Sequence, residues 1–284
     1  MNKIWFITGI SSGFGLEITR LVLRRGDVVV GTVRHTESTD ELAAEYPETL
    51  LRFTLDVRDR EALKSAIATA NKKFNRIDVL VNNAGYGLFG AAEEVSDSEI
   101  DAVIGTNLIG SITALRAVLP IMRKQKSGRI IQISSYGGQV AYAGNSLYHA
   151  TKFGIEGFCE SVAQEMRPFG VLVTIVEPGG ARTDFRYRSA HVAELNPAYE
   201  GNPAHAFLKM LNPKNGLAAG DPVRMAQRIV ETADKTDAHG QNAAPLRIVL
   251  GSQALHATLD ALQTRINELK TQENLARSTD IETA

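Results

Sequence analysis

The stretch Thr8-Gly9-Ile10-Ser11-Ser12-Gly13-Phe14-Gly15 joins an apolar run, Lys3–Thr8, to an amphipathic one, Gly15–Arg25. Its glycines let the backbone turn tightly and approach a pyrophosphate, and the amides and dipole at the start of a helix attract phosphate. Clustered glycines can also mark an ordinary turn. Because this cluster lies between a predicted strand and a predicted helix, it favours a phosphate cradle.

Short β-branched runs alternate with longer amphipathic runs along most of the chain. Strands are predicted over Lys3–Thr8, Val28–Val33, Leu50–Leu55, Val79–Asn82, Arg129–Ser134, Val171–Val176 and Leu246–Leu250. Helices are predicted over Gly15–Arg25, Glu61–Phe74, about Ser98–Lys124, about Ser146–Arg167, from Asp221–Pro222 onward, and about Ser252–Thr271. Helices that join parallel strands build a doubly wound sheet. We therefore expect one Rossmann-type α/β domain over residues 1–271, because two domains would each be thin in a chain of 284 residues.

The rhythm of strands and helices breaks after Pro178. Residues 182–220 carry scattered aromatic residues, prolines and glycines just beyond a strand end, a position that suits a substrate lid. The apolar wall of this lid would come from Phe185, Tyr187, Phe207, Leu208, Met210 and Leu211. Packing of the same side chains on the core is the alternative, which stays open for 207–211. Residues 272–284 are predicted to form a disordered polar tail.

Composition argues against several classes of partner. The 31 basic and 32 acidic residues give a formal net charge of −1, without long runs of either sign, so neither nucleic acid nor a charged membrane is expected. We see no signal peptide and no apolar stretch near the ~20 residues of a transmembrane helix. The only cysteine, Cys159, has no partner for a disulfide within the chain and suits a core position, so we expect a cytoplasmic protein. Scattered histidines predict no metal site.

Arg34 directly follows the second predicted strand, where NAD-specific proteins usually carry an acid that binds the ribose hydroxyls. An arginine there can instead accept a 2′-phosphate, although most arginines are simply solvated. This favours NADP(H) over NAD(H). Asp56, at the end of the third strand with Val57 after it, is assigned to the adenine amino group or, equally well, to a helix cap.

Tyr148 and Lys152 are four residues apart in a predicted helix, so they lie on one helix face. An ammonium group beside a phenol favours the phenolate and lowers the pKa of tyrosine from its usual value of ~10. Ser135 lies 13 residues before Tyr148, at the carboxyl edge of the sheet, where α/β folds bind ligands. Its hydroxyl could hold a substrate oxygen.

Two further asparagine motifs have simple structural interpretations. Asn82-Asn83-Ala84-Gly85 ends the fourth strand and could be an ordinary turn. Asn107, within a long predicted helix, could face solvent or bond a carbonyl group.

Together these motifs resemble the short-chain dehydrogenase/reductase family, in its single-domain branch, from Lys3 to about Thr183 and again from Asp221. The loop from Thr8 to Gly15 is similar to the family's TGxxxGxG, Asn82–Gly85 to its NNAG element, and Tyr148–Lys152 to its YxxxK core. Glu177-Pro178-Gly179 with Thr183 looks like its PG…T segment.

The resemblance implies a role for each matching residue. Tyr148 would be the general acid/base, Lys152 would lower its pKa and bind the nicotinamide ribose, Ser135 would polarise the carbonyl, and Asn107 would hold a water in a proton relay. Thr183 would contact the carboxamide, and Ser11 with Arg34 fits the NADP-preferring pattern. The remaining predicted cofactor-binding residues are Gly9, Ser12, Gly13, Phe14, Gly15, Asp56, Val57, Asn83, Ala84, Gly85, Pro178 and Gly179. The family also implies a homo-oligomer.

The predicted reaction is reversible hydride transfer between NADP(H) and a carbonyl or secondary alcohol. Alternatives on the same platform are reduction of an activated double bond or an imine. A regulatory cofactor sensor would keep Gly9–Gly15 but lose the catalytic residues, which are intact here. A nucleotide-sugar epimerase usually needs more chain after Thr183. The substrate itself is not encoded in any motif.

Overall fold

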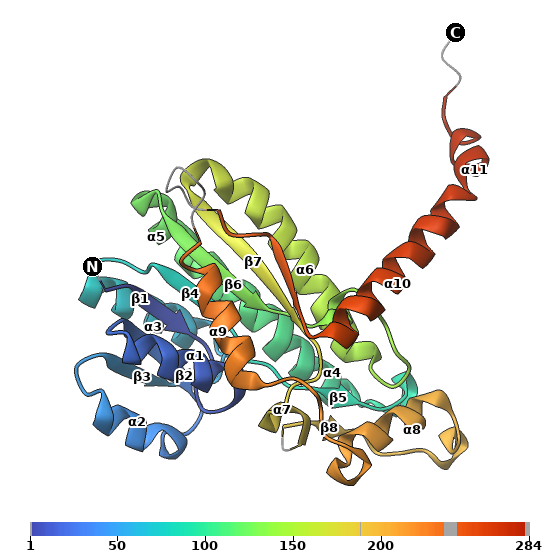
Figure 1. Ribbon diagram of the computed structural model, residues 1–284, viewed down its shortest axis with the longest axis horizontal. Helices are drawn as coiled ribbons and strands as arrows, with labels where there is room; N and C mark the ends of the chain where they lie inside the picture. The colour runs from blue at the N-terminus through green and yellow to red at the C-terminus, as the bar shows by residue number, and fades with distance from the viewer. Residues whose placement is uncertain (1, 188, 236–242, 282–284) are drawn as a thin grey trace.

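Figure 1 shows the computed structural model, which describes residues 2–187, 189–235 and 243–281. Its central sheet has seven parallel strands in the order β3-β2-β1-β4-β6-β7-β9. The strands are β1 (Ile4–Ile7), β2 (Val28–Val33), β3 (Leu50–Thr54), β4 (Val79–Asn82), β6 (Gly128–Ile133), β7 (Val171–Pro178) and β9 (Arg247–Leu250). The order reverses between β1 and β4, which confirms the predicted doubly wound sheet.

Helices cover both faces of this sheet (Figure 1). Two neighbouring residues of β1, Phe6 and Trp5, show why. Phe6 lies in the core that includes α3 (Arg60–Phe74), α5 (Ser111–Gln125) and α6 (Ser146–Met166). Trp5 lies in the opposite core, with α1 (Gly13–Arg24), α2 (Asp40–Glu45) and α9 (Pro222–Thr232). Successive strand residues point to opposite faces, so strands that are apolar throughout require helices on both. Cys159 is fully buried in the first core, as expected.

The predicted long helix from Ser98 is three segments in one run, α4 (Asp97–Ile104), a π-helical turn (Gly105–Gly110) and α5. By length and apolar composition, Asp97–Gln125 could span a membrane, contrary to the sequence-based expectation. In this fold α5 packs on α3, β4 and β6, as a core helix does. The core helix of a soluble protein can have the same length and composition.

The segment after β7 differs from the regular layers. It contains α7 (Asp184–Tyr187), β8 (His191–Val192) and α8 (Pro203–Leu208), joined by short 3₁₀ turns. Strand β8 pairs in parallel with β5 (Leu88–Phe89), a second small sheet that periodicity did not predict. These elements lie together beyond the carboxyl edge of the main sheet (Figure 1).

The C-terminal helix α10 (Ser252–Lys270) projects from the body of the molecule (Figure 1). The predicted disordered tail is wrong in part, because Glu273–Arg277 forms a further helix, α11. Residues 282–284 of that tail lie outside the described chain.

Candidate active site

The turn after β1 depends on glycine for two separate reasons. Gly9 and Gly13 adopt φ of +71° and +55°, a left-handed conformation that disfavours other residues. A Cβ on Gly15 would lie 2.1 Å from the Gly9 carbonyl oxygen, so no side chain fits there. The turn therefore presents bare backbone at the start of α1, as a phosphate cradle requires.

Asn83 fixes this turn against the end of β4. Its side-chain amide donates to the carbonyl oxygens of Thr8 (3.0 Å) and Gly9 (2.8 Å), and its backbone amide donates to the Thr8 hydroxyl (2.9 Å). The NNAG element is therefore more than an ordinary turn, because it connects the loops after β1 and β4.

A cavity of about 870 Å³ runs along this carboxyl edge of the sheet. It brings together most of the predicted site residues: Gly9, Ser11, Ser12, Gly13, Phe14, Arg34, Asp56, Val57, Asn83, Ala84, Gly85, Ser135, Tyr148, Lys152, Pro178, Gly179 and Thr183. Gly15 and Asn107 are not among the residues that line it. The volume and the glycine cradle suit a dinucleotide with room for a small substrate.

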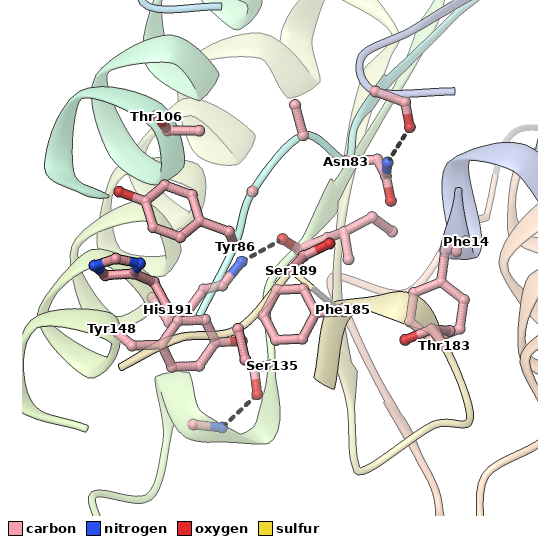
Figure 2. Close-up of a pocket in the computed structure, with 18 of the residues that line it drawn as sticks. Phe14, Asn83, Tyr86, Thr106, Ser135, Tyr148, Thr183, Phe185, Ser189 and His191 are labelled. Atoms are coloured by element: carbon pink, nitrogen blue, oxygen red, sulfur yellow. Dashed lines mark hydrogen bonds between the residues drawn. The ribbon is translucent and has the colours of Figure 1, made fainter. Parts of the chain in front are cut away.

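Three predicted catalytic side chains converge in this cavity. Ser135 follows β6, and its hydroxyl oxygen accepts a hydrogen bond from the Gly137 amide (3.0 Å). Lys152 Nζ donates to the Ile133 carbonyl oxygen (3.1 Å) and lies 5.5 Å from the centre of the Tyr148 ring. Figure 2 shows Ser135 and Tyr148 side by side on the cavity wall.

Burial dominates the electrostatics of the tyrosine and the lysine. It raises the pKa of Tyr148 to about 12, although hydrogen bonding with Ser135 acts in the opposite direction. It lowers the pKa of Lys152 to about 8, and the nearby Glu156 carboxylate partly opposes this. Removal of the phenolate from water therefore sets the direction of the Tyr148 shift in the protein alone. The effect of Lys152 on the tyrosine pKa stays a prediction.

Asn107 lies in the π-helical turn, with 1% of its surface exposed. Its amide donates to the Tyr86 carbonyl (2.8 Å) and the Thr151 hydroxyl (3.4 Å), and its oxygen accepts from the Tyr86 amide (3.0 Å). The side chain therefore holds the loop after β4 against α6. Its role in a proton relay stays a prediction.

At the other end of the cavity, Arg34 follows β2 and is exposed. Asp56 accepts hydrogen bonds from the Arg58 backbone amide (2.9 Å) and from its guanidinium (2.7 and 2.9 Å). Asp59, rather than Asp56, caps α3 through the amides of Glu61 and Ala62. Of the two assignments open for Asp56, the helix cap is therefore wrong.

Sequence analysis missed Arg58, which lines the cavity and neutralises Asp56. It also did not assign His149 to the site, whereas this side chain is buried beside Tyr148 and lines the cavity. A basic residue two positions after a strand-end acid was a signal for the first. The second had none, because the partners of His149, Gly137 and Tyr142, lie in the irregular loop before α6, whose path no periodicity predicts.

Aromatic rings form the substrate end of the cavity. Phe207 of α8 stacks on Phe89 and Tyr142, with ring centres 5.8 and 6.3 Å away, and Phe185 lies 5.9 Å from Tyr148. Figure 2 shows Phe185 beside the tyrosine. Of the predicted wall, Phe185, Phe207, Met210 and Leu211 line the cavity, Leu208 does not, and the Tyr187 side chain lies outside the described part.

The fold and this site define a dinucleotide-binding protein with a tyrosine–lysine–serine centre. Comparison with known proteins agrees: the family description "short chain dehydrogenase" matches residues 3–192. The chain is 37% identical to Oxidoreductase BOA17 of Botryotinia fuckeliana over 90% of its length and 91% of that protein. A short-chain dehydrogenase structure from Streptomyces avermitilis matches with a TM-score of 0.91 and 38% identity, over 99% of this chain and 100% of that one. The structure of ElxO with NADP bound matches with a TM-score of 0.70 and 26% identity, over 88% and 96%.

The chain therefore belongs to the short-chain dehydrogenase/reductase family and is an oxidoreductase of that family. Hydride transfer with a nicotinamide cofactor follows as its general chemistry.

Proposed function

We propose that this protein is an NADP(H)-dependent oxidoreductase that interconverts a largely apolar ketone or aldehyde and its alcohol, with Tyr148 as the general acid/base. The observation that carries the proposal is the convergence of Ser135, Tyr148 and Lys152 in the cavity that also contains the glycine cradle. A regulatory sensor would need the cradle alone.

The cofactor supplies or accepts the hydride at its nicotinamide ring, and the protein handles the proton. In the direction of reduction, the Tyr148 hydroxyl donates its proton to the carbonyl oxygen while the Ser135 hydroxyl donates a hydrogen bond to the same oxygen. With a pKa raised to about 12, Tyr148 stays protonated at neutral pH, as a proton donor must. Oxidation of an alcohol would need the phenolate, which positive charge from Lys152 and an oxidised nicotinamide favours.

Preference for NADP(H) is supported by the charge at the adenosine end. Arg34 lines the cavity and makes no ion pair with any residue in the described ranges, so its guanidinium is available to a 2′-phosphate. Asp56, the acid of this region, is paired with Arg58 and does not compete with the phosphate. ElxO, a structural relative, was solved with NADP.

The aromatic wall supports an apolar substrate. Phe89, Tyr142, Phe185 and Phe207 surround the space next to Tyr148, and their rings present apolar faces to a bound molecule. The hydroxyl groups of Ser135 and Tyr148 would orient the carbonyl in this space.

Stopped-flow and steady-state oxidation of NADPH with a panel of aromatic, aliphatic and charged carbonyl compounds tests the proposal. We expect turnover with apolar ketones or aldehydes, and loss of that turnover in Tyr148→Phe. NADPH binding without turnover of any carbonyl compound, activated alkene or imine would instead favour the sensor.

A further inference from the structure

One face of α6 holds the segment from Ile133 to Tyr142 at three points. Lys152 Nζ donates to the Ile133 carbonyl oxygen (3.1 Å). His149 bonds the Gly137 carbonyl oxygen through Nδ1 (2.6 Å) and accepts from the Tyr142 amide through Nε2 (3.1 Å). Residues three and four apart on a helix share a face, so the third point lies one turn after Lys152.

That third point is Glu156, whose surface is 2% exposed. Its Oε1 accepts a hydrogen bond from the Ser134 hydroxyl (2.5 Å), and its Oε2 accepts from the side-chain amide of Gln139 and from Arg247. A Cβ on Gly138 would lie 1.9 Å from Oε1. The loop from Ser134 to Gln139 is therefore built around this carboxylate.

A buried carboxylate is costly unless it is paired and fully hydrogen-bonded. Arg247 of β9 supplies the charge, because its guanidinium contacts Glu156, Glu177 and Glu160. Glu177 is 1% exposed, and its burial and the nearby Glu156 raise its pKa to about 7. Glu156 is thus the member of the cluster that connects this charge to the loop.

We propose that Glu156 is a positioning residue for the reaction: through Ser134 and Gln139 it fixes the loop that carries Ser135 opposite Tyr148. This inference rests on the proposed function. Glu156 lies outside the cavity lining, so its effect on the reaction passes through the loop. Reacting groups must be held within a few tenths of an ångström, and a misplacement of about 1 Å can cost 10²-fold in rate.

A comparison of Glu156→Gln with Glu160→Gln tests this role of Glu156. Glutamine at 156 keeps an acceptor for Ser134 but turns an amide group toward the Arg247 donor, so one side of the contact is lost. Glu160 binds the same arginine, yet its side chain is 46% exposed and contacts no part of the Ser134–Gln139 loop, which makes it the matched control.

With the most active carbonyl compound, we expect Glu156→Gln to lower kcat about tenfold or more, with KM for NADPH within about twofold. We also expect the alkaline limb of its pH–rate profile to move to lower pH, because the Glu156 charge raises the pKa of both Tyr148 and Lys152. Glu160→Gln should leave both readouts near those of the parent.

Hydrogen exchange of the peptide 134–142 gives a readout that needs no turnover. Faster exchange in Glu156→Gln than in Glu160→Gln, with NADPH binding retained, supports the positioning of the loop even if the parent reduces no carbonyl and the proposed function fails. Equal exchange and equal kcat in the two variants would overturn the inference. If Glu156→Gln does not fold, Gly138→Ala disturbs the same contact from the loop side and should show the same loss of kcat and loop protection.

Discussion

The cofactor end of the site and the lid are held in place by different means. At the cofactor end, Thr8 and Asn83 directly follow the buried strands β1 and β4. The Thr8 amide donates to the Val81 carbonyl oxygen (3.0 Å) and the Asn83 side chain donates to the Gly9 carbonyl oxygen (2.8 Å), so the glycine turn is hydrogen-bonded to the buried sheet. The lid, residues 182–220, joins the body through the short β5–β8 pair, a bridge between Ala181 and Gly220, the ring contacts of Phe185 and Phe207, and a few polar contacts.

Several of the polar contacts of the lid meet at one carboxylate, that of Glu94. Glu94 accepts hydrogen bonds from the Asn196 amide (2.7 Å) and the His205 side chain (2.7 Å) on the lid side, and from the Ala91 amide (2.6 Å) on the body side. Burial raises its pKa, but these hydrogen bonds outweigh the effect and hold the pKa of Glu94 below its usual value. When the lid opens, water can replace the polar contacts that the lid makes with Glu94. Water cannot reach the hydrogen bonds of the buried sheet in the same way, so the lid should open without disturbing the glycine turn.

The largest effect on activity is expected at the sheet-anchored part of the site, which contains the glycine turn and Tyr148. Tyr148→Phe removes only the proton-transferring oxygen, so kcat should fall about 10²–10⁴-fold while NADPH affinity stays within about twofold. Steady-state kinetics and fluorescence titration of NADPH measure the two quantities. Retention of more than about a tenth of parental kcat would exclude Tyr148 as the acid/base.

Arg34→Asp tests the adenosine end of the same sheet-anchored part of the site. Loss of a charged hydrogen bond to the 2′-phosphate should weaken NADPH binding roughly ten- to a hundredfold, with little effect on NADH. Calorimetric titration of both cofactors checks this, with Arg24→Ala, at the end of α1, as a control. Equal affinity of the parent for NADPH and NADH would contradict the preference.

Glu94→Gln should loosen the lid and leave the cradle intact. Charged hydrogen bonds contribute roughly 1.5–3 kcal/mol, so limited proteolysis between about 186 and 214 should become about tenfold faster, and saturating NADP(H) with substrate should slow it. Asp97→Asn, at the exposed start of α4, is the control. Unchanged cleavage in Glu94→Gln would show that the apolar wall, rather than this carboxylate, holds the lid.

The smallest effect concerns stability and pH in the sheet itself. Burial raises the pKa of Glu177 to about 7 from an ordinary value of 4.5. Between these values the folded state binds more protons than the unfolded state, so the free energy of unfolding should decrease as pH rises from about 4.5 to 7. Urea unfolding across this range should show a weaker decrease in Glu177→Gln than in the parent or in Glu165→Gln, whose side chain is exposed.

The sequence predicted the sheet and the sheet-anchored part of the site well, because their structure depends on residues that are close in sequence. The seven predicted strands of the main sheet are confirmed to within two residues at each end. The cavity is lined by residues of the glycine turn, by Arg34 at the end of a strand, and by Tyr148 and Lys152. Strand periodicity, tight turns and helical spacing depend on residues close in sequence. The lid followed no such period, and its pairing with β5 depends on residues about 100 positions away.

What the sequence determined by itself is the parallel sheet and the glycine turn, and it predicted which side chains meet in the cavity. Only the tertiary structure decided their environment: Asn107 holds Tyr86, Glu156 holds the serine loop, and burial raises the pKa of Tyr148. A sequence pattern specifies which chemical groups lie near one another on a single helix, strand or turn. Desolvation and hydrogen-bond partners arise from elements that meet only in the folded chain.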